Sequence, residues 1–162
     1  MGGGLAPAPP GMPRGMAESK VRSRAGTGPA RAVVLVLALV YLVLAVGGVV
    51  TVGWGSFGWE DPVTLFGVFG ISTLANILHG FIGVVALVAA LRGGAYAFAP
   101  VAGIAFTAMS AFGIAAKVFR DEGDPLNLTW WNVALYLCSL VACVVVYGLR
   151  VRLSRRTADR HG

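Results

Sequence analysis

The stretch Ile71–Leu91, ISTLANILHGFIGVVALVAAL, has the length and apolar character of a transmembrane helix, yet it contains an asparagine and a histidine. Its small and polar residues recur at alternating steps of four and three, close to the 3.5-residue period that keeps one side of a helix facing a partner. These residues are Ser72, Asn76, His79, Gly83, Ala86 and Ala90. Small residues let helices approach closely in a membrane, and polar side chains can bond across the contact. We therefore predict that this helix is the packing centre of a membrane bundle.

The overall composition is that of a membrane protein. Of the 162 residues, 57% are hydrophobic and 12% are charged, whereas charged residues make up about a quarter of an ordinary soluble domain. Apolar runs of about 20 residues, the length that crosses a bilayer, lie at about 32–52, 71–91, 95–116 and 128–149. The expected fold class is all-α, an integral membrane four-helix bundle formed by residues 31–150.

The basic residues are distributed as the positive-inside rule describes. Five precede the first predicted span, Arg92 separates spans two and three, and five follow span four. Only Lys117 and Arg120 lie on the opposite side of the predicted membrane. We therefore predict a protein of the cell (inner) membrane with both termini cytoplasmic. Residues 1–30 are expected to form a disordered basic tail, and residues 151–162 a second basic tail.

The same charge pattern limits the expected partners. Basic residues beside a span attract anionic headgroups, so a lipid bilayer with anionic headgroups is the first partner that we expect. A second copy of the chain or another membrane protein is the next. The formal net charge of +6 does not require nucleic acid, because topology explains it and no RNA-binding motif accompanies it.

The predicted outer loop, residues 53–70, is rich in aromatic residues and glycine. Its tryptophan and phenylalanine side chains suit the headgroup region of a membrane. Pro62 follows two acidic residues, an order typical of a helix start, and this order predicts a short interfacial helix over residues 63–70. A loop of this length also leaves open the alternative of a lid over the bundle.

Spans two and four resemble each other at an offset of 56 residues. The matched pairs are Thr73 with Thr129, Asn76 with Asn132, Gly83 with Ser139 and Ala86 with Ala142. Span four has its own small and polar seam, which comprises Asn132, Tyr136, Ser139 and Cys143. Two repeated helical hairpins that pack as a pseudo-symmetric bundle are therefore an additional prediction.

The segment NILHG, residues 76–80, followed by GVVA at residues 83–86, resembles the N-x-x-H signature of small bacterial four-span membrane proteins grouped as domain of unknown function 4383. The resemblance covers roughly residues 32–149 and implies a four-span fold. A related N-x-x-H in the last span of that family corresponds here to Asn132 and Leu135. The second histidine is therefore absent, which weakens any mechanism that needs a histidine pair. Since the family has no established activity, the resemblance leaves function open.

His79 is the principal candidate for chemistry, because ionisable residues inside a membrane warrant a functional hypothesis. A neutral imidazole has one donor and one acceptor, so it can bind a small ligand or relay a proton. The alternative, which we favour, is a hydrogen bond between helices. The candidate partners for that bond are Asn76, Tyr41, Thr107, Ser110 and Tyr136.

Asn76 and Asn132 are the other candidate ligand-binding residues. We expect them to pair across the bundle, and the alternative is a polar ligand that enters from outside. No cofactor is expected, because the other histidine, His161, lies in the terminal tail. No metal site is expected either, since Cys138 and Cys143 lack further ligands nearby in the sequence.

The sequence shows no nucleophile–base pair, carboxylate dyad or phosphate-binding loop, so we predict that the protein is not an enzyme. A structural or interaction role, with a polar packing seam inside the membrane, is the function that we expect. The alternative is a small carrier, channel or redox-accessory subunit that binds a small ligand or relays protons near His79.

Overall fold

The computed structural model describes residues 14–55, 63–119 and 124–159, apart from the side chains of residues 14–27 and 157. Its elements, in chain order, are α1 (Arg14–Val52), β1 (Thr64–Leu65), β2 (Phe69–Gly70), α2 (Thr73–Leu91), α3 (Ala95–Phe119) and α4 (Trp130–Ala158). Each of the four helices contains a segment long and apolar enough to cross a membrane. The predicted all-α membrane fold is therefore confirmed.

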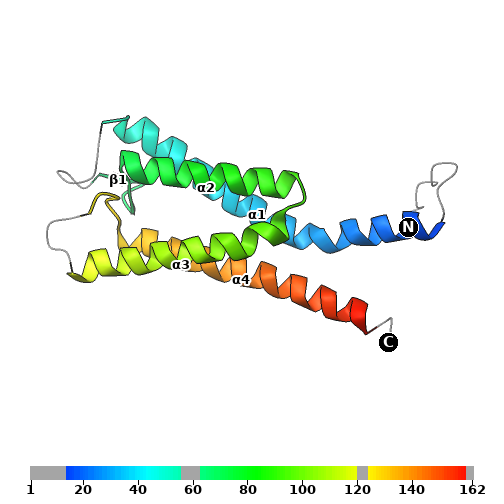
Figure 1. Ribbon diagram of the computed structural model, residues 1–162. Coiled ribbons are helices and arrows are strands. Elements are labelled where there is room, and N and C mark those ends of the chain that lie inside the picture. The colour runs from blue at the N-terminus through cyan, green and yellow to red at the C-terminus, as the bar shows by residue number, and fades with distance from the viewer. Residues whose placement is uncertain (1–13, 56–62, 120–123, 160–162) are drawn as a thin grey trace.

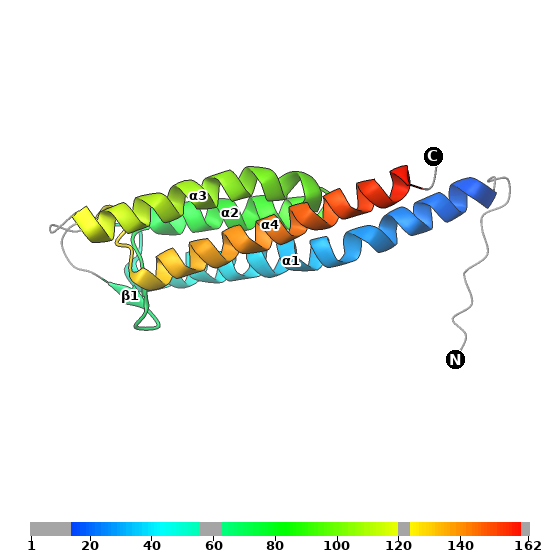
Figure 2. The same ribbon diagram turned by 90° about the horizontal axis from the view of Figure 1, so that it is seen from below.

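The helices run alternately up and down along one axis, so both termini lie at the same end of the molecule (Figure 1). The short strands lie at the opposite end, as the view from below also shows (Figure 2). We call the end with β1 and β2 the hairpin end and the other the terminal end. Packing is most extensive between α1 and α2 and between α3 and α4. The bundle thus consists of two helical hairpins laid side by side.

Local chemistry explains where α2 begins and ends. Ser72 adopts an extended backbone before the helix, and its hydroxyl accepts a hydrogen bond from the amide of Ala75, as an N-cap serine does. At the other end, the amide of Gly94 bonds the carbonyl of Ala89, and Gly93 has a positive φ of 77°. A left-handed glycine is the usual way to end a helix in a tight turn.

Glycine brings α1 and α2 into close contact. A Cβ atom at Gly83 would lie 2.8 Å from a side-chain carbon of Leu42, and one at Gly48 would collide with the amide of Asn76. Close approach through glycine is a common basis of helix packing in membranes. The outward faces carry large apolar side chains instead, for example Val46, Phe81 and Ile104, and these faces suit contact with lipid.

Residues 63–70 form a β-hairpin, so the interfacial helix predicted there is wrong. Thr64 pairs with Gly70 and Leu65 with Phe69. The turn between them places Phe66 at φ 55° and Gly67 at φ 72°, the left-handed pair that tight hairpin turns require. Residues 56–62 of the same loop, which bear on the lid alternative, lie outside the described residues.

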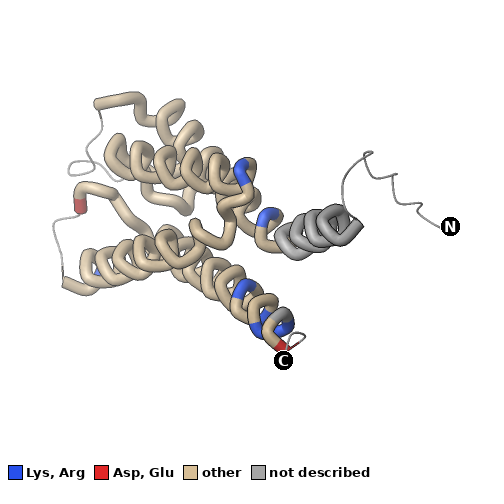
Figure 3. The backbone as a smooth tube through the Cα atoms, turned by 45° about the vertical axis from the view of Figure 1, so that its right-hand side comes forward, with Lys and Arg blue, Asp and Glu red and all other residues tan. Residues whose placement is uncertain are grey.

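Helices α1 and α4 continue past the predicted spans at the terminal end. Helix α1 begins at Arg14, so the predicted disordered tail is helical from that residue onward, while residues 1–13 lie outside the described part. Helix α4 continues to Ala158, so the arginines at the start of the predicted C-terminal tail are part of this helix. Figure 3 shows most of the lysine and arginine residues outside the grey parts gathered towards the terminal end.

Candidate functional site

A polar cluster occupies the buried centre of the bundle. It comprises Tyr41 of α1, His79 of α2, and Tyr136 and Ser139 of α4, and each of these residues is at most 1% exposed. The ring of Phe106 from α3 stacks on Tyr41, with ring centroids 5.4 Å apart. All four helices therefore contribute to one aromatic and polar centre.

The pair Tyr41–Ser139 joins the two helical hairpins. The oxygen atoms of the two hydroxyl groups lie 2.9 Å apart, and Ser139 also donates to the carbonyl of Leu135 at 2.8 Å. A serine hydroxyl has only one proton. Tyr41 is therefore the donor to Ser139, and Ser139 in turn donates to the backbone of α4.

The pair His79–Tyr136 makes the second connection between the hairpins. His79 Nε2 lies 3.0 Å from the hydroxyl oxygen of Tyr136, so Tyr136 is the partner among the five candidates. The other ring nitrogen, Nδ1, is buried and has no hydrogen-bond partner within the described residues. A neutral imidazole has one donor and one acceptor, so one of these two capacities is unused in either tautomer.

Asn132 has a different role from the one predicted. Its side-chain oxygen accepts from the amide of Gly70 at 2.9 Å and from the amide of Thr129 at 3.0 Å. Its Nδ2 donates to the carbonyl of Gly70 at 3.1 Å. The amide therefore pairs with the backbone of β2 as a neighbouring strand would. The expected contact between Asn76 and Asn132 is not formed.

Two further residues fix the β-hairpin to the start of α4, and a third orders the turn before that helix; sequence reasoning did not identify them as site residues. Asn127 Nδ2 donates to the carbonyls of Val63 and Ile71, and Thr129 Oγ1 donates to the carbonyl of Val68 at 2.7 Å. Asp124 accepts hydrogen bonds from the amides of Leu126 and Leu128. Their partners are backbone groups, which no side-chain pattern reveals.

Asp124 also carries the one ion pair found among the described residues. Lys117 Nζ lies 3.9 Å from Asp124 Oδ2, and Asp124 itself is 2% exposed. This arrangement neutralises a buried carboxylate near the hairpin end, where an unpaired charge would be costly.

Asn76 lies one turn into α2 and faces α1. Its side chain is 2% exposed, and its amide abuts the backbone at Gly48. Neither the nitrogen nor the oxygen of this amide finds a hydrogen-bond partner in the part of the chain that the structure describes. The hydroxyl of Thr73, one turn earlier on α2, is likewise buried and without a partner there.

The remaining seam residues of α2 serve the contact between helices. Ser72, Gly83 and Ala86 are all buried, and Ser72 also donates to the carbonyl of Pro125 at 2.9 Å. Ser72 therefore ties the start of α2 to the loop before α4. Among the described residues, no three His, Cys, Asp or Glu side chains are grouped as a metal site would require.

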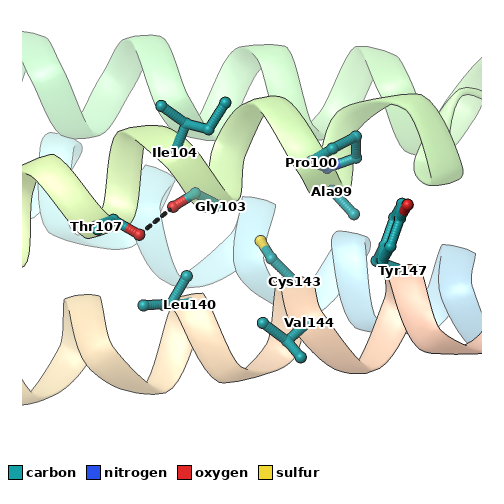
Figure 4. A pocket seen from close by; sticks show the side chains of 9 residues that line it. All are labelled: Ala99, Pro100, Gly103, Ile104, Thr107, Leu140, Cys143, Val144 and Tyr147. Carbon is teal, nitrogen blue, oxygen red and sulfur yellow. Dashed lines mark hydrogen bonds between the residues drawn. The ribbon is translucent and has the colours of Figure 1, made fainter.

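Two grooves lie on the flanks of the bundle. The groove between α1 and α2 has a volume of about 400 Å³ and includes Asn76, Gly80 and Phe81 in its lining. The groove between α3 and α4 has a volume of about 280 Å³, and Cys143 and Tyr147 lie along its α4 side (Figure 4). In that second groove, the Thr107 hydroxyl is already bonded to the carbonyl of Gly103. His79 lines neither groove.

The model of one protein family, described as a domain of unknown function (DUF4383), matches residues 31–149. These residues span all four apolar helices and every residue of the buried polar centre. The chain therefore belongs to this family. No curated protein and no solved structure matches the chain.

Proposed function

We propose that this protein is a non-enzymatic component of the inner membrane, with both termini in the cytoplasm and a structural or interaction role. The observation that supports this role is the pairing of buried polar groups across the hairpins. Tyr41 bonds Ser139, and His79 bonds Tyr136. Polar contacts of this kind hold helices together in membranes. These two pairs, which we call the lock, thus hold the two helical hairpins together.

The proposed orientation rests on the basic residues at the terminal end. Cysteines introduced at Ser154, near the end of α4, and at Phe66, in the turn between β1 and β2, should react with membrane-impermeant maleimide from opposite sides. Ser154→Cys is expected to react only after the cells are opened. Labelling of both positions in intact cells would refute the topology.

The proposed partners are anionic lipids at the terminal end and a second copy of the chain within the bilayer. Arg152, Arg155 and Arg156 lie on the helical extension of α4, where each basic residue near an anionic surface gains about 1 kcal/mol. Reconstituted protein labelled with two fluorophores should show energy transfer that persists on dilution with lipid. Loss of transfer in proportion to dilution would exclude the homo-oligomer.

A carrier, channel or redox-accessory role is the second candidate, because His79 Nδ1 and the Asn76 amide have no partner among the described residues. The two proposals differ in what a stable double variant does. His79→Leu combined with Tyr136→Phe removes both polar groups of the pair together, and Asn132, which also bonds Tyr136, keeps its hydrogen bonds to Gly70.

Proton flux into vesicles distinguishes the two roles. Under the structural proposal, vesicles that contain the wild-type protein, the double variant or no protein take up protons at the same rate. A wild-type flux that the double variant abolishes while remaining folded would replace the structural role with the relay.

A further inference from the structure

Asn76 lies in the lining of the groove between α1 and α2, and both polar atoms of its amide lack partners among the described residues. We propose that this groove binds a diacyl glycerolipid whose ester carbonyl accepts a hydrogen bond from Asn76 Nδ2. A buried amide without a partner is costly. A ligand that satisfies it therefore binds more tightly than one that offers only apolar contact.

The matching site on α4 indicates the chemistry of the ligand. Thr73 and Asn76 occupy the positions that correspond to Thr129 and Asn132 at the 56-residue offset. On α4, the threonine donates to the carbonyl of Val68, and the asparagine donates to the carbonyl of Gly70. The threonine Oγ1 lies equally close, 2.7 Å, to Asn132 Oδ1, so each acceptor at that site is a carbonyl oxygen of the backbone or of a side-chain amide. The same donors on α2 lack a carbonyl from the described chain, and a lipid ester in the groove supplies one to Asn76, the one of the two that lines the groove.

The depth of Asn76 matches the ester region of a bilayer. Helix α2 has 19 residues and is therefore about 28 Å long at 1.5 Å per residue, close to the thickness of the hydrocarbon core of about 30 Å. Asn76 is the fourth residue of this helix, about 4.5 Å below its first. Trp54, which also lines the groove, lies two residues after the end of α1, as an aromatic residue at the headgroup level does.

The groove itself suits an acyl chain. Apart from Asn76, its lining consists of Leu42, Ala45, Val46, Val49, Val50, Trp54, Ile77, Gly80 and Phe81. Val50 and Phe81 are more than 60% exposed, so the groove opens towards lipid. Gly80, also in the lining, adds no side chain to the groove. The groove between α3 and α4 offers a matched control, since its threonine hydroxyl is already bonded.

Ester and ether lipids test the proposal, because a diether lipid has the same chains and headgroup but no ester carbonyl. Trp54 serves as the reporter in a background with Trp59, Trp130 and Trp131 changed to Phe. The protein is reconstituted in unlabelled diether phosphatidylcholine, and brominated diester or brominated diether phosphatidylcholine is titrated in. We expect the diester lipid to reach half-maximal quenching at a mole fraction at least roughly threefold lower than the diether lipid does, as one hydrogen bond predicts.

The variants assign the preference to the groove. Asn76→Leu and the narrowing variant Val46→Phe should each make the two lipids equal, whereas Ile104→Phe in the other groove should leave the preference intact. Equal quenching in the reporter protein itself overturns the proposal, and this comparison needs no Asn76 variant to fold. A preference that survives both groove variants also overturns it. A quinone or a second copy of the chain found in the groove by mass spectrometry of photo-crosslinked protein would do so too.

Discussion

Asn76 and Asn132 occupy equivalent positions on α2 and α4, yet the first amide has no partner in the described chain and the second is hydrogen-bonded through both its oxygen and its nitrogen. Asn132 exchanges two hydrogen bonds with the backbone of Gly70, whereas the amide of Asn76 has no partner among the described residues. The difference arises in the loops. The loop between α1 and α2 contains a β-hairpin that reaches α4, whereas residues 124–129, the described part of the connection before α4, form no strand beside α2.

This contrast separates two uses of the same residue. On α4, the asparagine replaces a neighbouring strand and holds a loop that would otherwise leave backbone groups unpaired. On α2, it lies against a glycine of α1 and faces a groove. The sequence repeat therefore sets the positions of polar residues along each helix. The loop that contacts them decides whether they bond the protein backbone, as Asn132 does, or are left without a partner in the described chain, as Asn76 is.

The largest expected effect distinguishes the two asparagines directly. Asn132→Leu leaves the amide and carbonyl of Gly70 and the amide of Thr129 without their partner, and each such group costs about 1–3 kcal/mol when buried. We expect the free energy of unfolding to fall by about 3 kcal/mol or more. Asn76→Leu should change it by less than about 1 kcal/mol, because no protein bond is lost. Unfolding in mixed micelles measures both, and equal losses would contradict the assigned difference.

The second prediction compares two glycines, Gly70, which Asn132 bonds, and Gly48, which lies against Asn76. A Cβ at Gly70 would collide with the backbone carbonyl of Asn127, whereas one at Gly48 would collide with the movable side chain of Asn76. Gly70→Ala should therefore cost about 2–3 kcal/mol, within the range for overpacking, and Gly48→Ala about 1 kcal/mol.

Rescue provides the control for this pair. Asn76→Ala should restore the stability of Gly48→Ala, because it removes the group with which the new methyl collides. The same cycle has no counterpart at Gly70, since a backbone atom cannot be deleted. Failure of the rescue would show that the Gly48 contact lies elsewhere.

The third prediction concerns the lock between the hairpins. Tyr136→Phe leaves His79 Nε2 without its one described hydrogen bond, and His79→Leu leaves the Tyr136 hydroxyl with Asn132 as its remaining side-chain partner, so each variant should cost about 1 kcal/mol or less. The double variant should cost less than the sum, with a coupling of about 0.6–1.7 kcal/mol, as for other hydrogen bonds inside membranes. Additive losses in a double-mutant cycle would mean that the two groups are not paired.

The helices could be predicted from the sequence because their pattern is local. The 3.5-residue period of α2 placed Asn76, His79 and Gly83 on one face, and all three are buried. The same reasoning included Tyr136 among the candidate partners of His79, since both lie on the seams of their own helices. It could not select one from five, because rotation between helices is not encoded in either helix alone.

The hairpin and its contacts could not be predicted in the same way. Pro62 and the acids before it indicated a helix start, while Gly67 suits the left-handed position of a tight turn. The turn prevailed although Phe66 also adopts a positive φ of 55°, which a bulky side chain rarely does. The partners of Asn132 and Asn127 are backbone groups of that hairpin. Because every residue has such groups, side-chain patterns do not show which of them an asparagine will meet.

The smallest expected effect on the free energy of unfolding concerns the pairing of Tyr41 with Ser139. Tyr41→Phe removes the donor, but Ser139 keeps its bond to the carbonyl of Leu135, and the ring keeps its stacking on Phe106. We expect a loss of about 0.5 kcal/mol or less, because no buried group becomes unpaired. Ser139→Ala should cost more, about 1 kcal/mol, since it leaves the fully buried Tyr41 hydroxyl without an acceptor. If Tyr41→Phe proves the costlier variant in the same unfolding assay, then the proton of the pair lies on serine, and the direction of the hydrogen-bond chain is reversed.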